Sequence, residues 1–250
     1  FNILFPERRD FFLENAETFA FGSGNNNLIP FFSRRIGLSS AGTPIPIVGG
    51  ARISGQIGHY DLGFIEMKTE RAGATPANNY AVGRLKRNLF RNSWLGTLVT
   101  NRNSTVNGDN NSVYGADARF QFFDHLWLDS HILRSKTPLL PGKDQARQFE
   151  AAWRGNELTV ATGYNEIQTN FNPEAGFIRR GNNTRYNGEV SWNPVLKSSH
   201  VVRNLAFGAK TEYFEGGTTR KIETRTEAVN LGIDLQNNSS VDFVMTNTFD

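Results

Sequence analysis

The chain has 250 residues, of which 38% are hydrophobic and 20% charged, and its formal net charge is +3. This length fits one large β domain or two smaller domains, and so small a net charge is not the signal of a nucleic-acid-binding protein. The absence of cysteine excludes a disulfide framework and a thiolate metal site. No apolar run reaches the roughly 18 residues that a transmembrane helix needs.

Residues 1–46 show no sustained alternation of polar and apolar side chains. A short helix is expected around Asn15–Glu17, and the prolines and glycine of SSAGTPIP interrupt the chain before the first strand. A long irregular segment of this kind is usually a functional loop or plug. We therefore predict an irregular N-terminal segment over residues 1–46, which lies at the outer mouth of a barrel or folds back into its lumen.

From residue 47 onward the sequence predicts antiparallel hairpins, and residues 112–135 show the pattern most clearly. Because successive side chains of a strand point to opposite faces, this hairpin has one apolar face and one polar face. The apolar face carries Tyr114, Ala116, Ala118, Phe120, Phe122, Leu126, Leu128 and Ile132; the polar face carries Asp117, Arg119, Gln121, Asp129 and His131. A turn near Phe123-Asp124 separates two arms of about eleven residues, which is long enough to cross a bilayer at a tilt.

The predicted connections fall into two length classes. Tight turns are expected near residues 58, 90, 124, 155, 216 and 238. Long polar loops are expected at 70–79, 101–111, 136–145 and 169–183, so that short and long connections alternate over the first eight strands. The connection at 193–204 breaks this alternation, because its position calls for a short turn and it is long. Outer-membrane barrels have short periplasmic turns and longer outer loops. The sequence therefore predicts an all-β fold over residues 47–250, an antiparallel up-and-down transmembrane β-barrel of about twelve visible strands.

In such a barrel the apolar face meets lipid and the polar face lines the lumen. The predicted lumen-facing residues are Asp117, Gln121, Asp129, His131, Glu150 and Arg154. A soluble all-β domain, such as a lipocalin-like barrel or a sandwich, stays open as an alternative, because it also has one apolar and one polar face.

Six short motifs follow one another between residues 4 and 190: LFPERRDFFLEN, FFSRRIG, IPIVGGARISGQIG, VGRLKRN, LVTNR and FNPEAGFIRR. In this order they resemble a bacterial outer-membrane β-barrel family of unknown function, in which the barrel usually follows an N-terminal family-9 carbohydrate-binding-like module. The resemblance implies an outer-membrane location in Gram-negative bacteria. It also implies a barrel larger than the part seen here, with that module and some early strands outside this chain. The family has no established activity and no catalytic residues that the resemblance could carry over to this chain.

Several arginines are candidates for binding at the lumen or mouth, because a guanidinium group suits an anionic solute or a lipopolysaccharide phosphate. They are Arg8, Arg9, Arg34, Arg35, Arg119, Arg179 and Arg180. The alternative is that these arginines form salt bridges within the protein.

Glu7, Asp10 and Glu14 flank the Arg8-Arg9 pair. Paired carboxylates could support acid/base chemistry on a sugar, but the interpretation we favour is that they attach a plug to a charged barrel wall. The four histidines show no metal-ligand spacing and the chain has no nucleotide-binding motif. We therefore predict no catalytic residues, no metal and no cofactor.

The expected function is that of an outer-membrane barrel that admits a solute or anchors a component of the envelope, with a link to carbohydrate handling implied by the resemblance. Its expected partners are the lipid bilayer, lipopolysaccharide and a small solute or saccharide, and nucleic acid is not among them. An envelope enzyme or saccharide-binding protein that uses the N-terminal acidic cluster is the first alternative, and a soluble all-β domain is the second.

Overall fold

The structure is a computed structural model that describes residues 6–22, 27–39 and 42–250. Within these ranges the short helices are α1 (Asp10–Leu13), η1 (Ala16–Phe19) and η2 (Ser33–Arg35). The strands are β1 (Leu28–Ile29), β2 (Ile47–Ile57), β3 (Tyr60–Thr69), β4 (Asn78–Asn88), β5 (Trp94–Ser104), β6 (Asn110–Phe122), β7 (Leu126–Lys136), β8 (Gln145–Arg154), β9 (Leu158–Ile167), β10 (Phe177–Ile178), β11 (Asn183–Trp192), β12 (Val202–Gly216), β13 (Ile222–Leu235) and β14 (Ser240–Phe249).

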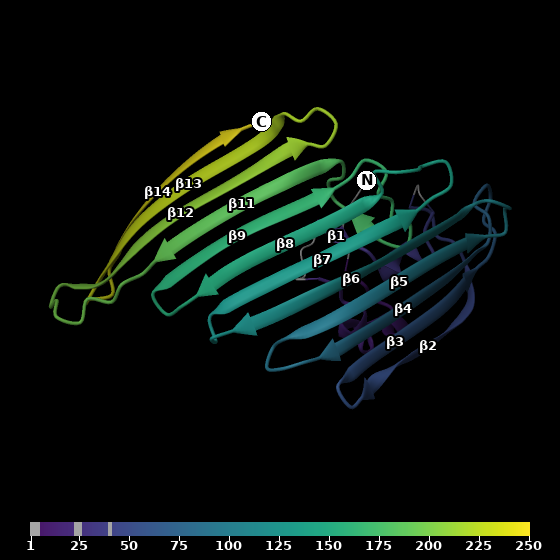
Figure 1. Ribbon diagram of the computed structural model, residues 1–250, viewed down its shortest axis with the longest axis horizontal. Coiled ribbons are helices and arrows are strands. Elements are labelled where there is room, and N and C mark those ends of the chain that lie inside the picture. Colours follow the sequence, from purple (N-terminus) through teal and green to yellow (C-terminus); the bar gives the residue numbers. More distant parts are fainter. Residues whose placement is uncertain (1–5, 23–26, 40–41) are drawn as a thin grey trace. The chain divides into compact units, whose positions relative to one another are not determined.

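Twelve of the strands form one sheet in which neighbours in sequence are neighbours in space (Figure 1). The hydrogen-bonded order is β14-β13-β12-β11-β9-β8-β7-β6-β5-β4-β3-β2, and β1 pairs separately with β10. The predicted all-β, up-and-down arrangement is therefore confirmed. In the described part of the chain β2 and β14 each pair with a single neighbour, so the hydrogen-bonded order has two edges.

The tight turn between β6 and β7 forms where the sequence predicts it. The amide of His125 donates to the carbonyl of Phe122 at 3.2 Å, and the two central residues, Phe123 and Asp124, have φ of 53° and 60°. Positive φ at both central positions is typical of the type I′ turn, whose twist matches that of the flanking strands.

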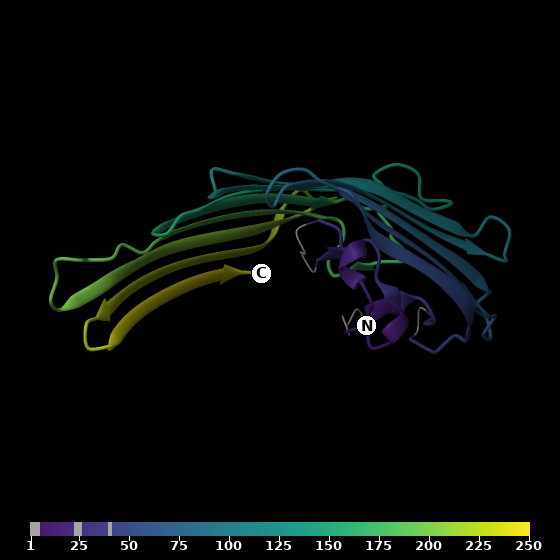
Figure 2. The same cartoon turned by 90° about the horizontal axis from the view of Figure 1, so that it is seen from below.

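The chain divides into two compact units. Unit 1 comprises residues 1–119, 130–146 and 168–181, and unit 2 comprises residues 120–129, 147–167 and 182–250. In unit 1 the N-terminal segment packs on one face of the first strands, as Figure 2 shows. The core of unit 1 joins Phe12, Phe19 and Ile36 of this segment to side chains of β3, β4 and β5, namely Ile65, Met67, Tyr80, Val82 and Leu98, and to Ala175. The described part of the predicted N-terminal segment is therefore packed on the strands, and the expected short helix is η1.

The connection predicted at residues 169–183 is long, as expected, but it is not an exposed polar loop. This connection contains β10, which pairs with β1 through Leu28–Ile178 and Ile29–Phe177. Phe171, Ala175 and Phe177 are buried. The apolar side chains in this stretch explain the difference, because burying them against the N-terminal segment removes their surface from water.

The two faces of the sheet differ in the way the alternation predicts. On β5, Leu95 and Val99 are 45% and 51% exposed, whereas Leu98 between them is fully buried. On β6, Tyr114 is 37% exposed and Asp117 only 3%. In unit 1 the uncovered face therefore exposes large apolar side chains such as Leu95 and Val99, whereas the face covered by the N-terminal segment carries both the apolar core and buried charged side chains such as Asp117. We call these the apolar face and the polar face.

Candidate functional site

Among the residues that the structure describes, the most buried charged side chains are Arg84 of β4 and Asp117 of β6, which form an ion pair. Arg84 Nη1 and Nη2 donate to the two carboxylate oxygens of Asp117 at 2.6 and 2.9 Å, and the two side chains are only 1% and 0% exposed. The aromatic ring of Phe21 lies 5.3 Å from the guanidinium carbon and 5.5 Å from the ring of His131. With Phe21, Gly22 and His131, this pair forms what we call the Arg84 cluster.

Two glycines make the Arg84 cluster possible. Arg84 and Asp117 are not on adjacent strands, so the pair crosses β5 at Gly96, where a Cβ atom would lie 2.5 Å from Arg84 Nη1. Gly22 has φ of +68°, its amide donates to Asp117 Oδ2 at 2.8 Å, and a Cβ there would lie 2.9 Å from His131 Nδ1. Because neither Gly22 nor Gly96 has a side chain, the N-terminal segment and Arg84 can both reach the carboxylate of Asp117.

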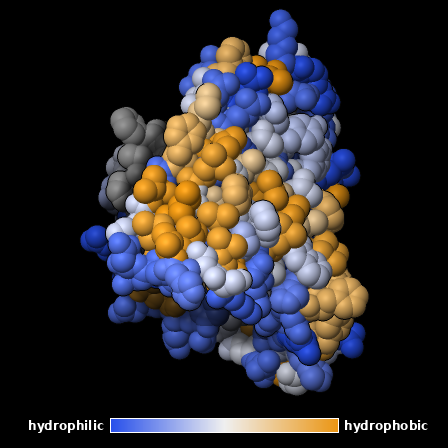
Figure 3. All heavy atoms as spheres, turned by 90° about the vertical axis from the view of Figure 1, so that its left-hand side faces the viewer, coloured by the Kyte–Doolittle hydropathy of each residue, from blue (hydrophilic) through white to orange (hydrophobic). Residues whose placement is uncertain are grey.

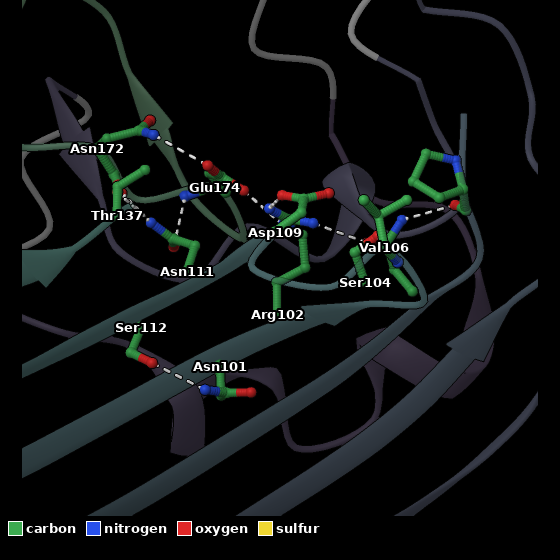
Figure 4. Close-up of polar contacts among 12 residues, drawn as sticks. Asn101, Arg102, Ser104, Val106, Asp109, Asn111, Ser112, Thr137, Asn172 and Glu174 are labelled. Atoms are coloured by element: carbon green, nitrogen blue, oxygen red, sulfur yellow. Dashed lines mark hydrogen bonds and ion pairs between the residues drawn. The ribbon is translucent and has the colours of Figure 1, made fainter. Parts of the chain in front are cut away.

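A second cluster lies around Arg102 of β5 and is shown in Figure 4. Arg102 donates from Nη1 to Asn78 Oδ1 at 2.8 Å and also forms ion pairs with Asp109 and Glu174. Asp109 belongs to the connection between β5 and β6, and Glu174 to the segment before β10. The single guanidinium of this Arg102 cluster therefore fixes two connections to the sheet through charge-assisted hydrogen bonds.

Asn111 of β6 holds the same segment in place next to the Arg102 cluster. Its amide nitrogen donates to Thr137 Oγ1 and to the carbonyl of Asn172, each at 2.8 Å, and its oxygen accepts from the amide of Glu174 at 3.2 Å (Figure 4). Asn111 is 1% exposed. Because the side-chain amide of Asn111 is buried and fully hydrogen-bonded, it fixes the backbone of the segment that carries Glu174.

Within the N-terminal segment, Glu7 binds Arg9 and Ser33. Arg9 donates to Glu7 Oε1 from Nε at 2.9 Å and to Oε2 from Nη2 at 2.7 Å, and Ser33 Oγ donates to Oε2 at 2.6 Å. Burial raises the pKa of Glu7, but the hydrogen bonds from Arg9, from Ser33 and from the backbone amides of Arg9 and Arg8 outweigh it and lower this pKa from 4.5 to about 2. Arg9 also donates to the carbonyls of Ile36 and Ser33, so the pair ties the start of the segment to its end.

Acid is expected to loosen the N-terminal segment between about pH 4.5 and pH 2. A carboxylate whose pKa is depressed in the folded protein stabilises it above the unfolded pKa, and this contribution is lost as the pH falls through the folded pKa. The chain has no cysteine, so a single cysteine at exposed Leu13 can carry a fluorophore whose anisotropy reports the motion of the segment. In Glu7→Gln the drop in anisotropy across this window should disappear. An unchanged drop would show that other carboxylates control it.

The predicted arginine sites are mostly engaged inside the protein. Arg9 binds Glu7, Arg34 donates to the carbonyl of Pro6 at 2.7 Å, and Arg35 donates to the carbonyl of Gly176 at 3.1 Å. The side chains of Arg8 and Arg179 are exposed, and those of Arg119 and Arg180 are partly buried. The structure thus does not bring the seven predicted arginines together in one site.

The carboxylates of the N-terminal acidic cluster are also held separately. Glu7 is bound by Arg9, and Glu14 forms an ion pair with Arg52 of β2, while Asp10 begins α1. Each glutamate thus has its own arginine rather than sharing a site with the other. This arrangement is typical of attachment of the segment and does not provide the pair of facing carboxylates that glycoside hydrolysis requires.

The residues predicted to line the lumen share the polar face by alternation along their strands. Asp117 and His131 lie under Phe21 and Gly22, and Asp129 is buried. In unit 2, Gln121 donates to the carbonyl of Asp124 at 2.8 Å, and Glu150 pairs with Arg154 at 4.0 Å. Their lumen role stays a prediction.

Arg84, Arg102 and Glu174 were not identified from the sequence as site residues. Arg84 stands in the motif VGRLKRN and Glu174 in FNPEAGFIRR, so the motifs contained them, but the sequence holds no signal of which carboxylate each arginine meets. The missing information is strand register, because it decides that Gly96 lies beside Asp117.

No family model, curated protein or solved structure matches this chain. In the described residues, no helix is both long enough and apolar enough to cross a membrane. Across the same residues, no three His, Asp or Glu side chains are grouped so that they could hold a metal ion.

Proposed function

We propose that this chain forms wall strands of a β-barrel in the outer membrane of a Gram-negative bacterium, with the N-terminal segment acting as a plug. The observation that carries the proposal is the distribution of side chains between the two faces. A soluble sheet buries its apolar face and exposes its charged face. Here the Arg84–Asp117 pair is buried while Leu85, Leu95 and Val99 are 40%, 45% and 51% exposed.

The strands of unit 2 support the proposal through two rows of aromatic side chains on one face. Tyr164, Tyr186 and Tyr213 stand opposite one another on β9, β11 and β12, and Trp192 stands opposite Phe207 at the other ends of β11 and β12. At about 3.3 Å per residue, roughly 20 Å of strand separates Tyr186 from Trp192. Because the strands of membrane barrels are tilted by roughly 40°, this length covers about 15 Å of the height of about 25 Å expected for the apolar band between the aromatic girdles.

One row of residues between these two aromatic rows is apolar, whereas the row beside it consists of Thr162, Gly188, Thr211 and Glu227. The pairing of β9, β11, β12, β13 and β14 aligns a row across the strands, which consists of Val160, Val190, Ala209, Val229 and Met245. Apart from the small Ala209 these side chains are 42–62% exposed. Hydrophobic patches bordered by hydrophilic residues are visible in Figure 3. An exposed apolar band of this kind favours contact with lipid over contact with water.

A barrel in lipid must satisfy the backbone groups of its edge strands, because the bilayer core offers no hydrogen-bonding partner. We therefore infer that the edges of β2 and β14 become paired in the membrane, either with each other or with further strands. The packing of the N-terminal segment on the polar face of unit 1, together with the ion pairs there, favours a protein that admits a solute under control or anchors another envelope component. The resemblance to the barrel family associated with a carbohydrate-binding-like module favours a saccharide as the solute.

Membrane fractionation tests the proposal. The expected result is that the protein sediments with outer membranes, resists extraction by alkaline carbonate and is released only by detergent. In planar bilayers the purified protein should conduct weakly, and deleting residues 6–22 should raise its conductance because the plug is removed. Extraction without detergent would instead support a soluble all-β domain.

A further inference from the structure

A groove of about 500 Å³ crosses the apolar face of unit 1 between β3 and β7. Short side chains lie in it, where Thr97 stands opposite both Leu85 and Ala116, and Ala118 stands opposite Leu95. The taller side chains that flank them are Leu85, Leu95 and Ile132. The difference in side-chain height makes a trough whose lining is almost entirely apolar.

One end of this groove carries a guanidinium group. Arg87 lies opposite both Leu95 and Tyr60, and its guanidinium carbon is 5.6 Å from the centre of the Tyr60 ring. Arg87 is exposed, and the described residues give it no ion-pair partner. By contrast, Arg134 and Arg147, which also project from the apolar side of their strands, pair with Asp144 at 3.1 Å and Glu166 at 3.9 Å.

The position of Arg87 along its strand indicates the membrane leaflet that it faces. Arg87 is the last residue but one of β4, next to the short turn that leads to β5, whereas Arg134 lies toward the end of β7 that leads into a longer connection. Short turns of outer-membrane barrels face the periplasm. The groove therefore opens toward the periplasmic leaflet if the proposed function is correct.

We propose that this groove binds a phospholipid, with one acyl chain against Ala116 and Ala118 and the phosphate on Arg87. The inference rests on the proposed function. A guanidinium group binds phosphate with two parallel hydrogen bonds, and stacking on Tyr60 holds it in position. The acyl chain adds close packing with the trough, which is the main attraction available between apolar groups in lipid. Free phosphate would use Arg87 alone.

Native mass spectrometry of the full chain in detergent micelles tests the site. The probes are dioleoylphosphatidylglycerol, uncharged dioleoylglycerol and inorganic phosphate. The wild-type protein is expected to retain one phosphatidylglycerol molecule. Arg87→Gln should weaken this retention by about tenfold, since a charge-assisted hydrogen bond is lost. Ala118→Phe should remove retention of phosphatidylglycerol, because the ring fills the trough, and uncharged dioleoylglycerol should be retained more weakly than phosphatidylglycerol by the wild type. Arg134→Gln is the matched control, and it should retain lipid as the wild type does.

Equal lipid retention in the wild type, Arg87→Gln and Ala118→Phe would overturn the inference. Binding of inorganic phosphate that Ala118→Phe leaves unchanged, without lipid retention, would show a phosphate site instead and would also overturn it. Carbonate-resistant membrane assembly is measured on the same proteins. Wild-type assembly without retained lipid would reject the groove and leave the proposed function standing, whereas failure of the wild type to assemble would reject both.

Discussion

Replacing Asp117 by Asn is expected to lower the free energy of unfolding by about 3–5 kcal/mol, because it leaves the charge of Arg84 buried without a partner. Both side chains of this pair are at most 1% exposed, and they are joined by two hydrogen bonds. The substitution also weakens the acceptor for the amide of Gly22, so the N-terminal segment should loosen together with the sheet. Urea unfolding of the protein in lipid vesicles, followed by tryptophan fluorescence, measures the change.

Two further variants separate the charge from the packing. Glu150→Gln is the matched control, since its pair with Arg154 spans 4.0 Å and the two side chains are 32% and 54% exposed. Glu150→Gln should lower the free energy of unfolding by less than about 1 kcal/mol. The double variant Arg84→Met/Asp117→Leu should recover much of the loss, because apolar side chains of similar volume often replace a buried pair well. If Asp117→Asn and Glu150→Gln lowered the free energy of unfolding equally, the burial of the Arg84–Asp117 pair would not be the reason for its contribution to stability.

The hairpin of β6 and β7 shows how much of the fold the sequence could predict. Alternation from Tyr114 to Phe122 depends only on the period of a strand, so the two faces and the turn at Phe123-Asp124 could be predicted from local pattern alone. The same applies to the up-and-down order, since strands joined by short connections are usually neighbours in the sheet.

The Arg84 cluster shows what local pattern could not provide. Arg84, Gly96 and Asp117 come from three strands, and they meet only because Gly96 stands opposite Asp117 in the register of β5 and β6. A shift of one residue would send Asp117 to the apolar face. Gly22 adds a contact with Asp117 over a still longer separation in sequence. Such contacts depend on the whole fold.

Residues 169–183 show a different limit. Composition predicted a polar loop, because Asn, Thr, Arg and Gly dominate the stretch. Its few apolar residues decide its place instead, as Phe171 and Phe177 are buried and β10 pairs with β1. Arg102 also forms an ion pair with Glu174 in the same stretch, so this connection is packed against the rest of unit 1 and is not an exposed loop.

Asp in place of Ala118 or Phe120 is expected to block assembly of the protein into membranes, whereas Asp in place of Gln121 is not. All three positions lie on β6, and they differ in the face to which they point: Ala118 and Phe120 share the apolar face with Tyr114, and Gln121 shares the polar face with Asp117. A carboxylate facing lipid costs on the order of 1–3 kcal/mol, depending on its depth. The same group on the polar face stays near water and other charges.

Assembly is measured by adding urea-unfolded protein to lipid vesicles and scoring the fraction that becomes resistant to carbonate and to protease. Ala118→Asp and Phe120→Asp should lower this fraction about tenfold, as a cost near 1.4 kcal/mol implies. Gln121→Asp should change it by less than about twofold. Ala118→Ser separates polarity from charge and should assemble nearly as well as the wild type. If all four variants assembled equally, the apolar face would not be the lipid face, and the exposed Leu95, Val99 and Ile132 would need another partner.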